Sequence, residues 1–334
     1  MTENHQQQLL HVTNGDIVAG KITQAGLGEH VLPWRDVLSE GPVPAKLSLI
    51  NLAHRRSKFI EAAGWAPYRE TRQAMAERDS ELLRFKDYDG VVFWFEHDLT
   101  DQLQMLQALE RFATRGDEGT PMWLVTTDRF PDVDRFVGIG QLRPDQLPEL
   151  YAQRRELVHE DFRAARRAWE VFRSPDPRII EEVLLEDTSR FPYLASALRR
   201  HVEQFPGADD GLSGTERDIL TLLSEQPREA GALFAAAQAR EDAPFLSDLA
   251  FQLHVDRLMS GARPLVQAGD DADSSDNLGL ELTARGKAVL SGSETYADAD
   301  YPARWLGGVE MNPVTVPWRW DRAASRIISA ESGD

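Results

Sequence analysis

The chain has 334 residues, 42% of them hydrophobic, and it contains no cysteine. This length exceeds what one hydrophobic core usually fills, so we expect two domains. The lack of cysteine excludes disulfides, thiolate nucleophiles and cysteine-held metal centres. The formal net charge of −18 sets up a field that opposes binding of nucleic acid unless one face is locally basic.

The apolar runs are too short for a membrane helix, which needs roughly 20 residues. The first eight residues are polar and lack the basic and apolar regions of a secretory signal. We therefore expect a soluble, cytoplasmic protein that does not contact a membrane.

Four apolar runs in the first half each end in a polar cluster. The clusters are Asn14-Gly15-Asp16, Trp34-Arg35-Asp36, Glu96-His97-Asp98 and Thr127-Asp128. This pattern is typical of parallel strands buried in an open α/β sheet, whose carboxyl ends meet at one edge and bind ligands there. Residues 1–150 are therefore predicted to form an α/β ligand-binding domain, an open, mostly parallel sheet with flanking helices.

Helical periodicity marks the segments between these runs. It predicts helices over residues 17–27, 47–63, 68–85 and 99–112. The prolines and glycine of residues 39–44 predict a loop beside the second cluster. Residues 135–140 read as a short fifth strand that ends at Gln141.

The second half is mainly helical. Residues 151–210 are expected to form a helical connector, and Ser213 with Glu216 matches a capping box that opens a helix. Residues 211–292 have the element order of a winged helix: three helices (215–224, 230–239, 245–259), two strands (264–267, 280–282) and a helix (284–290). Residues 293–334 are expected to form a tail that docks on the body.

The winged-helix-like segment is acidic. Residues 211–290 contain 7 basic and 13 acidic residues, and its third helix carries Asp248 and Asp256 against Arg257. A helix that reads DNA needs a face compatible with phosphate. The charge therefore favours protein contacts, including a homo-oligomer through the C-terminal half, over DNA binding.

Long motifs in both halves resemble a known bacterial family. The first half is similar to the family called domain of unknown function 1835, and the second half resembles the domain that often follows it. The resemblance implies no established reaction. The motifs that carry it span residues 10–16, 31–44, 95–102, 166–169, 172–177, 305–308 and 318–321.

The first polar cluster allows two interpretations. Asn14 and Gly15 suit a turn, and Asp16 with the turn amides could hold a ligand hydroxyl or ammonium group. Alternatively, Asp16 only caps the following helix. His11 lies within the strand, where a ligand-binding role and a satisfied buried histidine are both open.

The second cluster combines a cation, a carboxylate and an aromatic ring. Arg35 with Asp36 could grip phosphate or carboxylate, and Trp34 could stack on a ligand ring. The alternatives are an internal ion pair of Arg35 with Asp36 or Glu40, and a Trp34 side chain that is simply buried.

The third cluster is the strongest catalytic candidate. Side-chain alternation predicts that Glu96 and Asp98 share one side of the chain while His97 lies on the other. Asp98 could instead cap the next helix. Glu96 follows a buried aromatic strand, so desolvation should raise its pKa and suit it to proton transfer, with His97 as a second acid–base group.

The cofactor remains open at this stage. A magnesium or manganese ion could be held by His11, Asp16, Glu96, His97 and Asp128, because oxygen-rich ligation favours these ions over zinc. Asp128 and Gln141 are further candidate ligand-binding residues. The chain lacks a P-loop, a GxGxxG motif after its first strand and a nucleophile elbow.

The sequence thus predicts an enzyme, a hydrolase or transferase, acting on a small polar metabolite that is phosphorylated or nucleotide-like. Asp16, Arg35, Glu96 and His97 should meet in one cleft. The alternative is a non-catalytic small-molecule-binding module whose winged-helix-like domain contacts protein. A DNA-binding regulator is a third reading.

Overall fold

The computed structural model describes residues 7–113, 119–186, 188–269, 279–296, 303–312 and 318–330. The chain divides into two compact units. The first comprises Met1–Leu38, Lys46–Val171 and Asp187–Ala197, and the second comprises Ser39–Ala45, Phe172–Glu186 and Leu198–Asp334. No helix of the described residues is both long and apolar enough to cross a bilayer.

The first unit is built on a five-stranded sheet in the order β2-β1-β3-β4-β5. The first four strands pair in parallel, and β5 is antiparallel to β4. The predicted open, mostly parallel α/β sheet is therefore confirmed. The strands are β1 (Leu9–Thr13), β2 (His30–Pro33), β3 (Gly90–Trp94), β4 (Met122–Val125) and β5 (Arg155–Glu156).

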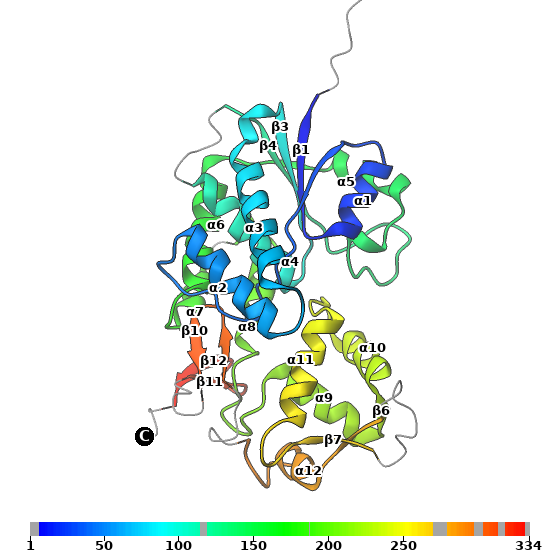
Figure 1. The fold of residues 1–334 in the computed structure, drawn as a ribbon, viewed down its shortest axis with the longest axis vertical. Helices are drawn as coiled ribbons and strands as arrows, with labels where there is room; N and C mark the ends of the chain where they lie inside the picture. The colour runs from blue at the N-terminus through cyan, green and yellow to red at the C-terminus, as the bar shows by residue number, and fades with distance from the viewer. Residues whose placement is uncertain are drawn as a thin grey trace, which may run out of the picture. The chain divides into compact units, whose positions relative to one another are not determined.

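Helices cover both faces of this sheet. In Figure 1, α1 and α5 lie on one side and α3, α4 and α6 lie on the other. Every residue of β1 and of β3 is buried, because each face packs against apolar helix surfaces. The helices of this unit are α1 (Asp16–Gln24), α2 (Leu49–Ala62), α3 (Tyr68–Leu83), α4 (Leu99–Leu109), α5 (Leu147–Ala152) and α6 (His159–Phe172).

Local sequence signals explain where the predicted helices begin. Ser48 caps α2 by accepting a hydrogen bond from the Asn51 amide, and Asp98 caps α4 in the same way. For α1 the N-cap is Gly15, so Asp16 lies in the first turn and is not the capping residue. The four helices predicted in the first half are confirmed, with ends shifted by a few residues.

The predicted strand over residues 135–140 is wrong. The structure has a short 3₁₀ helix there, Ile139–Gln141, and the fifth strand of the sheet is β5. A strand needs a neighbour for its backbone hydrogen bonds. At this segment the amide of Ile139 donates instead to the side chain of Glu96.

The strand register brings the carboxyl ends of the parallel strands to one level. Thr13 lies opposite both Pro33 and Trp94, and Trp94 lies opposite Val125. The connection from β1 leads to β2 on one side, whereas the connection from β3 leads to β4 on the other. The crevice between the ends of β1 and β3 is therefore the topological switch point, where open α/β sheets bind ligands.

The second unit contains helices and small antiparallel sheets. The predicted elements of residues 211–290 are found, and β6, β8 and β7 form one sheet in that order. Residues 270–278, between the two predicted strands, lie outside the described residues. The elements are α7 (Ile179–Leu185), α8 (Leu194–Val202), α9 (Gly214–Glu225), β6 (Arg228–Glu229), α10 (Ala230–Arg240), α11 (Asp248–Met259), β7 (Val266–Ala268), β8 (Gly279–Leu282) and α12 (Ala284–Leu290).

The described part of the C-terminal tail forms two hairpins that belong to this unit. Strands β9 (Arg304–Leu306) and β10 (Val309–Met311) pair with each other, as do β11 (Trp318–Asp321) and β12 (Arg326–Ser329). The amide of Trp320 donates to the carbonyl of Pro206, and its carbonyl accepts from the amide of Ala208. These backbone hydrogen bonds hold the tail against the rest of the second unit.

The segment Ser39–Ala45 places a carboxylate inside the second unit. Glu40 is 1% exposed. Its Oε1 lies 2.7 Å from Nε2 of His254, and its Oε2 lies 3.3 Å from the guanidinium of Arg257. The expectation that Glu40 pairs with Arg35 is therefore wrong. Burial opposes ionisation of Glu40, but its interactions with His254, Arg257 and Arg304 outweigh burial and lower its pKa to about 2.

We predict that Glu40→Gln destabilises the protein by about 3–5 kcal/mol at neutral pH, because it leaves Arg257 without its buried counter-charge. Urea denaturation measures this loss. Ionised Glu40 contributes stability above its ordinary pKa near 4.5, and that contribution disappears as the pH falls toward 2. The difference between variant and wild type should therefore shrink in acid.

The matched control for this prediction is Glu310→Gln, since Glu310 lies exposed on β10 of the same unit. It should leave the free energy of unfolding within about 0.5 kcal/mol of the wild type. Equal stability of the Glu40 and Glu310 variants would show that the buried ion pairs do not stabilise this unit.

Candidate functional site

A pocket of about 390 Å³ lies at the carboxyl edge of the sheet, at the switch point between β1 and β3. Three segments line it: the turn from β1 into α1, the segment from the end of β3 into α4, and residues 137–141. The lining residues are Asn14, Gly15, Asp16, Ile17, Val18, Glu96, Thr100, Gln104, Val137, Gly138, Gly140 and Gln141.

Glu96 is a buried carboxyl group at the wall of this pocket, with 5% of its surface exposed. Its Oε1 accepts a hydrogen bond of 2.6 Å from the amide of Ile139. Burial, and next the charge of Asp98, raise the pKa of Glu96 to about 8. The backbone amides of Ile139 and Gly140 oppose this rise. Glu96 therefore holds its proton at neutral pH and can release it under mildly basic conditions.

The approach of Glu96 to residues 138–140 requires a glycine. Gly138 has a φ of 153°, and a Cβ at this position would overlap the Glu96 carboxyl group. Only glycine combines this backbone conformation with the free space. The third lining segment is thus shaped around the carboxyl group of Glu96.

Two aspartates at the start of α4 complete a carboxyl cluster with Glu96. Oδ1 of Asp98 accepts a hydrogen bond of 3.1 Å from the amide of Asp101. Nδ2 of Asn14 donates to Oδ2 of Asp101 over 2.9 Å. One oxygen from each of Glu96, Asp98 and Asp101 lies within 4.8 Å of the others.

The cluster concentrates negative charge in a buried place. Asp98 and Asp101 are 7% and 1% exposed. Burial is the main cause that raises the pKa of both groups, and for Asp101 the charges of Asp98 and Glu96 add to it. Carboxyl groups this close cannot all ionise, so they share protons at neutral pH. The geometry suits acid–base chemistry or the binding of a cation.

The structure brings together only part of the predicted site. Asn14, Asp16, Glu96 and Gln141 line the pocket, and Asp98 belongs to the carboxyl cluster. Both predictions for Asp98 are compatible, because it caps α4 and lies beside Glu96.

His11 and His97 lie outside the pocket lining. Nδ1 of His11 accepts a hydrogen bond of 3.0 Å from the indole of Trp94, and burial lowers the pKa of His11 to about 4. It is a neutral histidine of the sheet interior. His97 is 9% exposed and packs against the rings of Phe136 and Tyr193. Its charge partly opposes the raised pKa of Asp98.

The second cluster forms internal contacts. Arg35 pairs with the exposed Asp16 over 2.5 Å, so the alternative ion pair of Arg35 with Asp36 does not form. Asp36 forms a buried ion pair with Arg56 over 2.7 Å. These side chains therefore do not form a free anion clamp.

Trp34 and Asp128 also have protein partners. The indole of Trp34 donates to Gln107 over 2.6 Å, and Arg78 lies 4.2 Å above its ring. Its 1% exposure makes it part of the core. Asp128 accepts a hydrogen bond from the hydroxyl of Tyr193 at the surface. The predicted metal set of His11, Asp16, Glu96, His97 and Asp128 does not assemble; among the described residues, the group that could hold an ion is the carboxyl cluster.

Sequence reasoning missed Asp101, Gln104 and Gly138. The spacing of Asp98 and Asp101 is a usable signal, because two carboxylates three positions apart at a helix start lie on one face. The role of Gly138 has no local signal, since it depends on contact with Glu96 across 42 positions.

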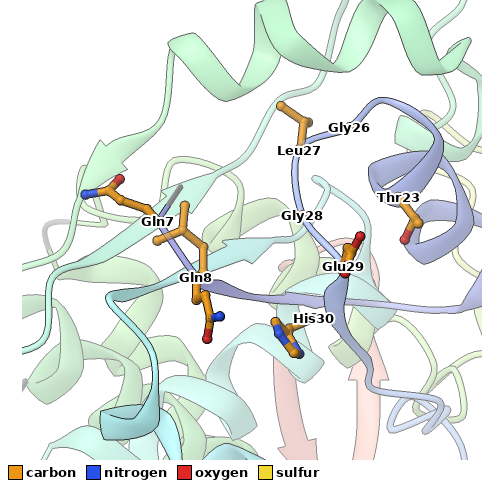
Figure 2. Close-up of a pocket in the computed structure, with 9 residues that line it drawn as sticks. Gln7, Gln8, Thr23, Gly26, Leu27, Gly28, Glu29 and His30 are labelled. Carbon is orange, nitrogen blue, oxygen red and sulfur yellow. The ribbon is translucent and has the colours of Figure 1, made fainter. Parts of the chain in front are cut away.

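A second hollow, of about 340 Å³, lies at the amino ends of β1 and β2 (Figure 2). Its titratable side chains, Glu29 and His30, are exposed. It gathers no buried charged groups, so the carboxyl-edge pocket is the candidate site.

Comparison of the chain with protein-family models gives no match, and comparison with curated proteins gives none either. The candidate site therefore rests on the geometry alone.

We predict that Gly138→Ala destabilises the protein by about 1–3 kcal/mol, because alanine strains the backbone and displaces the Glu96 carboxyl group. The cost should fall when Glu96→Ala removes that carboxyl group. A double-mutant cycle by urea denaturation measures the coupling. Independent effects of the two substitutions would contradict the proposed contact.

We predict a distinct pH dependence for Glu96→Gln. Between pH 4.5 and about 8 the folded wild type keeps a proton on Glu96 that the unfolded chain has lost, so its stability falls as pH rises. The slope from this group is at most about 1.4 kcal/mol per pH unit. Denaturation at pH 5 and pH 8 should show a shallower fall for the variant, and an unchanged slope would mean that Glu96 ionises normally.

Proposed function

We propose that the protein is an enzyme, a hydrolase or transferase, acting on a small polar metabolite at the carboxyl edge of its sheet. The observation that carries the proposal is the buried carboxyl cluster that opens into a pocket at the switch point. Titratable groups with strongly displaced pKa values in a pocket are candidates for acid–base catalysis. The pKa of Glu96, about 8, is in the useful range for proton transfer.

Glu96 is the proposed catalytic acid. At neutral pH it carries a proton that it can donate to a leaving group. The amides of Ile139 and Gly140 then stabilise the carboxylate that remains. The negative charge of Asp98 helps to keep the proton on Glu96 before the reaction, and the first turn of α4 positions Asp98.

The pocket supports a substrate of modest size with an anionic group. A volume of about 390 Å³ falls within the usual range for small-molecule sites. The first turn of α1 lines the pocket and has no side-chain cap. Uncapped amides at a helix start favour an anion such as phosphate. The α1 amides therefore replace Arg35 as the proposed contact for the anion, because Arg35 is paired with Asp16.

Two finer assignments accompany this proposal. The motifs quoted from both halves support membership in the family called domain of unknown function 1835. The order of α9 to α12 supports a winged-helix-like domain, and Asp248 and Asp256 on α11 favour protein over DNA as its partner.

The proposal predicts that wild-type protein consumes a compound in a bacterial metabolite extract, and that Glu96→Gln loses at least about 100-fold of this activity, the usual range for a catalytic acid. Time-resolved mass spectrometry of the extract measures consumption. A compound that is retained by the protein without being consumed would instead identify a non-catalytic binding module.

The matched control is Glu29→Gln, since Glu29 lies at the second hollow (Figure 2). This variant should consume the compound at the wild-type rate. If Glu29→Gln loses activity and Glu96→Gln keeps it, the active site has been placed at the wrong edge of the sheet.

A further inference from the structure

We propose that the carboxyl cluster of Glu96, Asp98 and Asp101 is a binding site for a divalent cation of the Mg²⁺ or Mn²⁺ type. The proposal rests on the same pocket as the proposed function, but it concerns binding and not turnover. A bound cation requires the ionised carboxylate, so Glu96 acts as the proposed acid only when the cation is absent. One oxygen from each side chain lies within 4.8 Å of the others, and all three residues are buried.

In the described part of the chain the cluster has no lysine or arginine as a counter-charge, and the charge of His97 only partly opposes the raised pKa of Asp98. Among the described residues, no lysine or arginine forms an ion pair with any of the three carboxyl groups, whereas the buried Asp36 and Glu40 each have one. Buried carboxylates are normally paired or bind a metal. A cation from solution would supply the missing charge, and it can arrive through the pocket that Glu96 lines.

Unused acceptor atoms at the site form a second observation. Gln104 lines the same pocket as Glu96 and is 3% exposed. Its Nε2 donates to the carbonyl of Asp36, which leaves Oε1 as a buried acceptor without a hydrogen-bond donor in the described part of the chain. Oδ1 of Asp101 is in the same state. A metal ion satisfies such acceptors and adds positive charge, whereas water adds none.

The donor set selects the kind of ion. The cluster offers oxygen atoms and no histidine or cysteine ligand, which disfavours zinc. Mg²⁺ binds oxygen at about 2.1 Å in an octahedron, so opposite ligands lie roughly 4.2 Å apart. Neighbouring ligands of the same octahedron lie about 3 Å apart. The three carboxyl oxygens lie within 4.8 Å of one another, so small side-chain shifts suffice to bring them to these separations. Mg²⁺ and Mn²⁺ usually retain several waters, which the pocket can accommodate.

This site would define the substrate class more closely. An ion between the carboxyl cluster and the uncapped start of α1 would bind an oxygen of a phosphorylated substrate while the α1 amides bind the same group. The metal also neutralises the carboxyl cluster, which removes the repulsion that an anionic substrate would otherwise meet.

Titration of the purified, metal-stripped protein with Mn²⁺ at pH 8 tests the proposal, with free Mn²⁺ measured by electron paramagnetic resonance and no substrate present. We expect one Mn²⁺ per chain, displaced by Mg²⁺. Asp101→Asn should weaken binding by at least about tenfold. It preserves the size of the side chain and an acceptor for Asn14, and circular dichroism verifies its fold. If it fails to fold, Glu96→Gln replaces it, with the same loss expected.

The matched control is Glu29→Gln, because Glu29 is an exposed carboxylate at the second hollow and outside the cluster. It should bind Mn²⁺ as the wild type does. No binding at millimolar Mn²⁺, or equal affinity of the cluster variant and the wild type, overturns the cation site. If Mn²⁺ does not bind but the protein still consumes a substrate, the cation site is wrong and the proposed enzyme is supported. If Mn²⁺ binds but no compound is consumed, the cation site is supported and the proposed catalysis is wrong.

Discussion

The first turn of α4 is the constraint on which the candidate site depends. Asp98 caps the helix and Asp101 lies one turn further on, so the amides and the dipole at this helix start face two carboxyl groups. The helix start lowers the cost of burying these charges but does not cancel it. Burial of Glu96, and next the charge of Asp98, raise the pKa of Glu96, and the same closeness of three carboxyl groups is the basis of the proposed cation site.

The rest of the pocket is arranged around these carboxyl groups. Asn14, at the end of β1, holds Asp101, and residues 138–140 bring backbone amides to Glu96. Arg35, the cation of the second polar cluster, is paired with Asp16 and has a positive φ of 48°. The pocket therefore combines acidic side chains with backbone donors, a combination better suited to a metal-bound anion than to a free one.

The second unit also buries carboxylates, but it pairs them with arginine. Glu40 and Glu216 are buried carboxylates, and each has an arginine within 3.4 Å. These interactions hold the pKa of both groups below their usual values despite burial. This protein therefore supplies an arginine where a buried carboxylate stabilises the fold. The carboxyl cluster of the first unit has no such arginine among the described residues, which supports a functional role for the cluster.

The sequence by itself determined most of the helices, the four parallel strands and the edge of the sheet where polar groups collect. It also placed Glu96 and Asp98 on one side of the chain and Asp98 at a helix start. These features depend on periodicity and capping within a few residues. Only the tertiary structure decided which groups meet: Glu96 bonds an amide 43 positions away, Asn14 holds Asp101 across 87 positions, and Glu40 finds His254 across 214. Such partners are chosen by packing between distant segments, which no local pattern encodes.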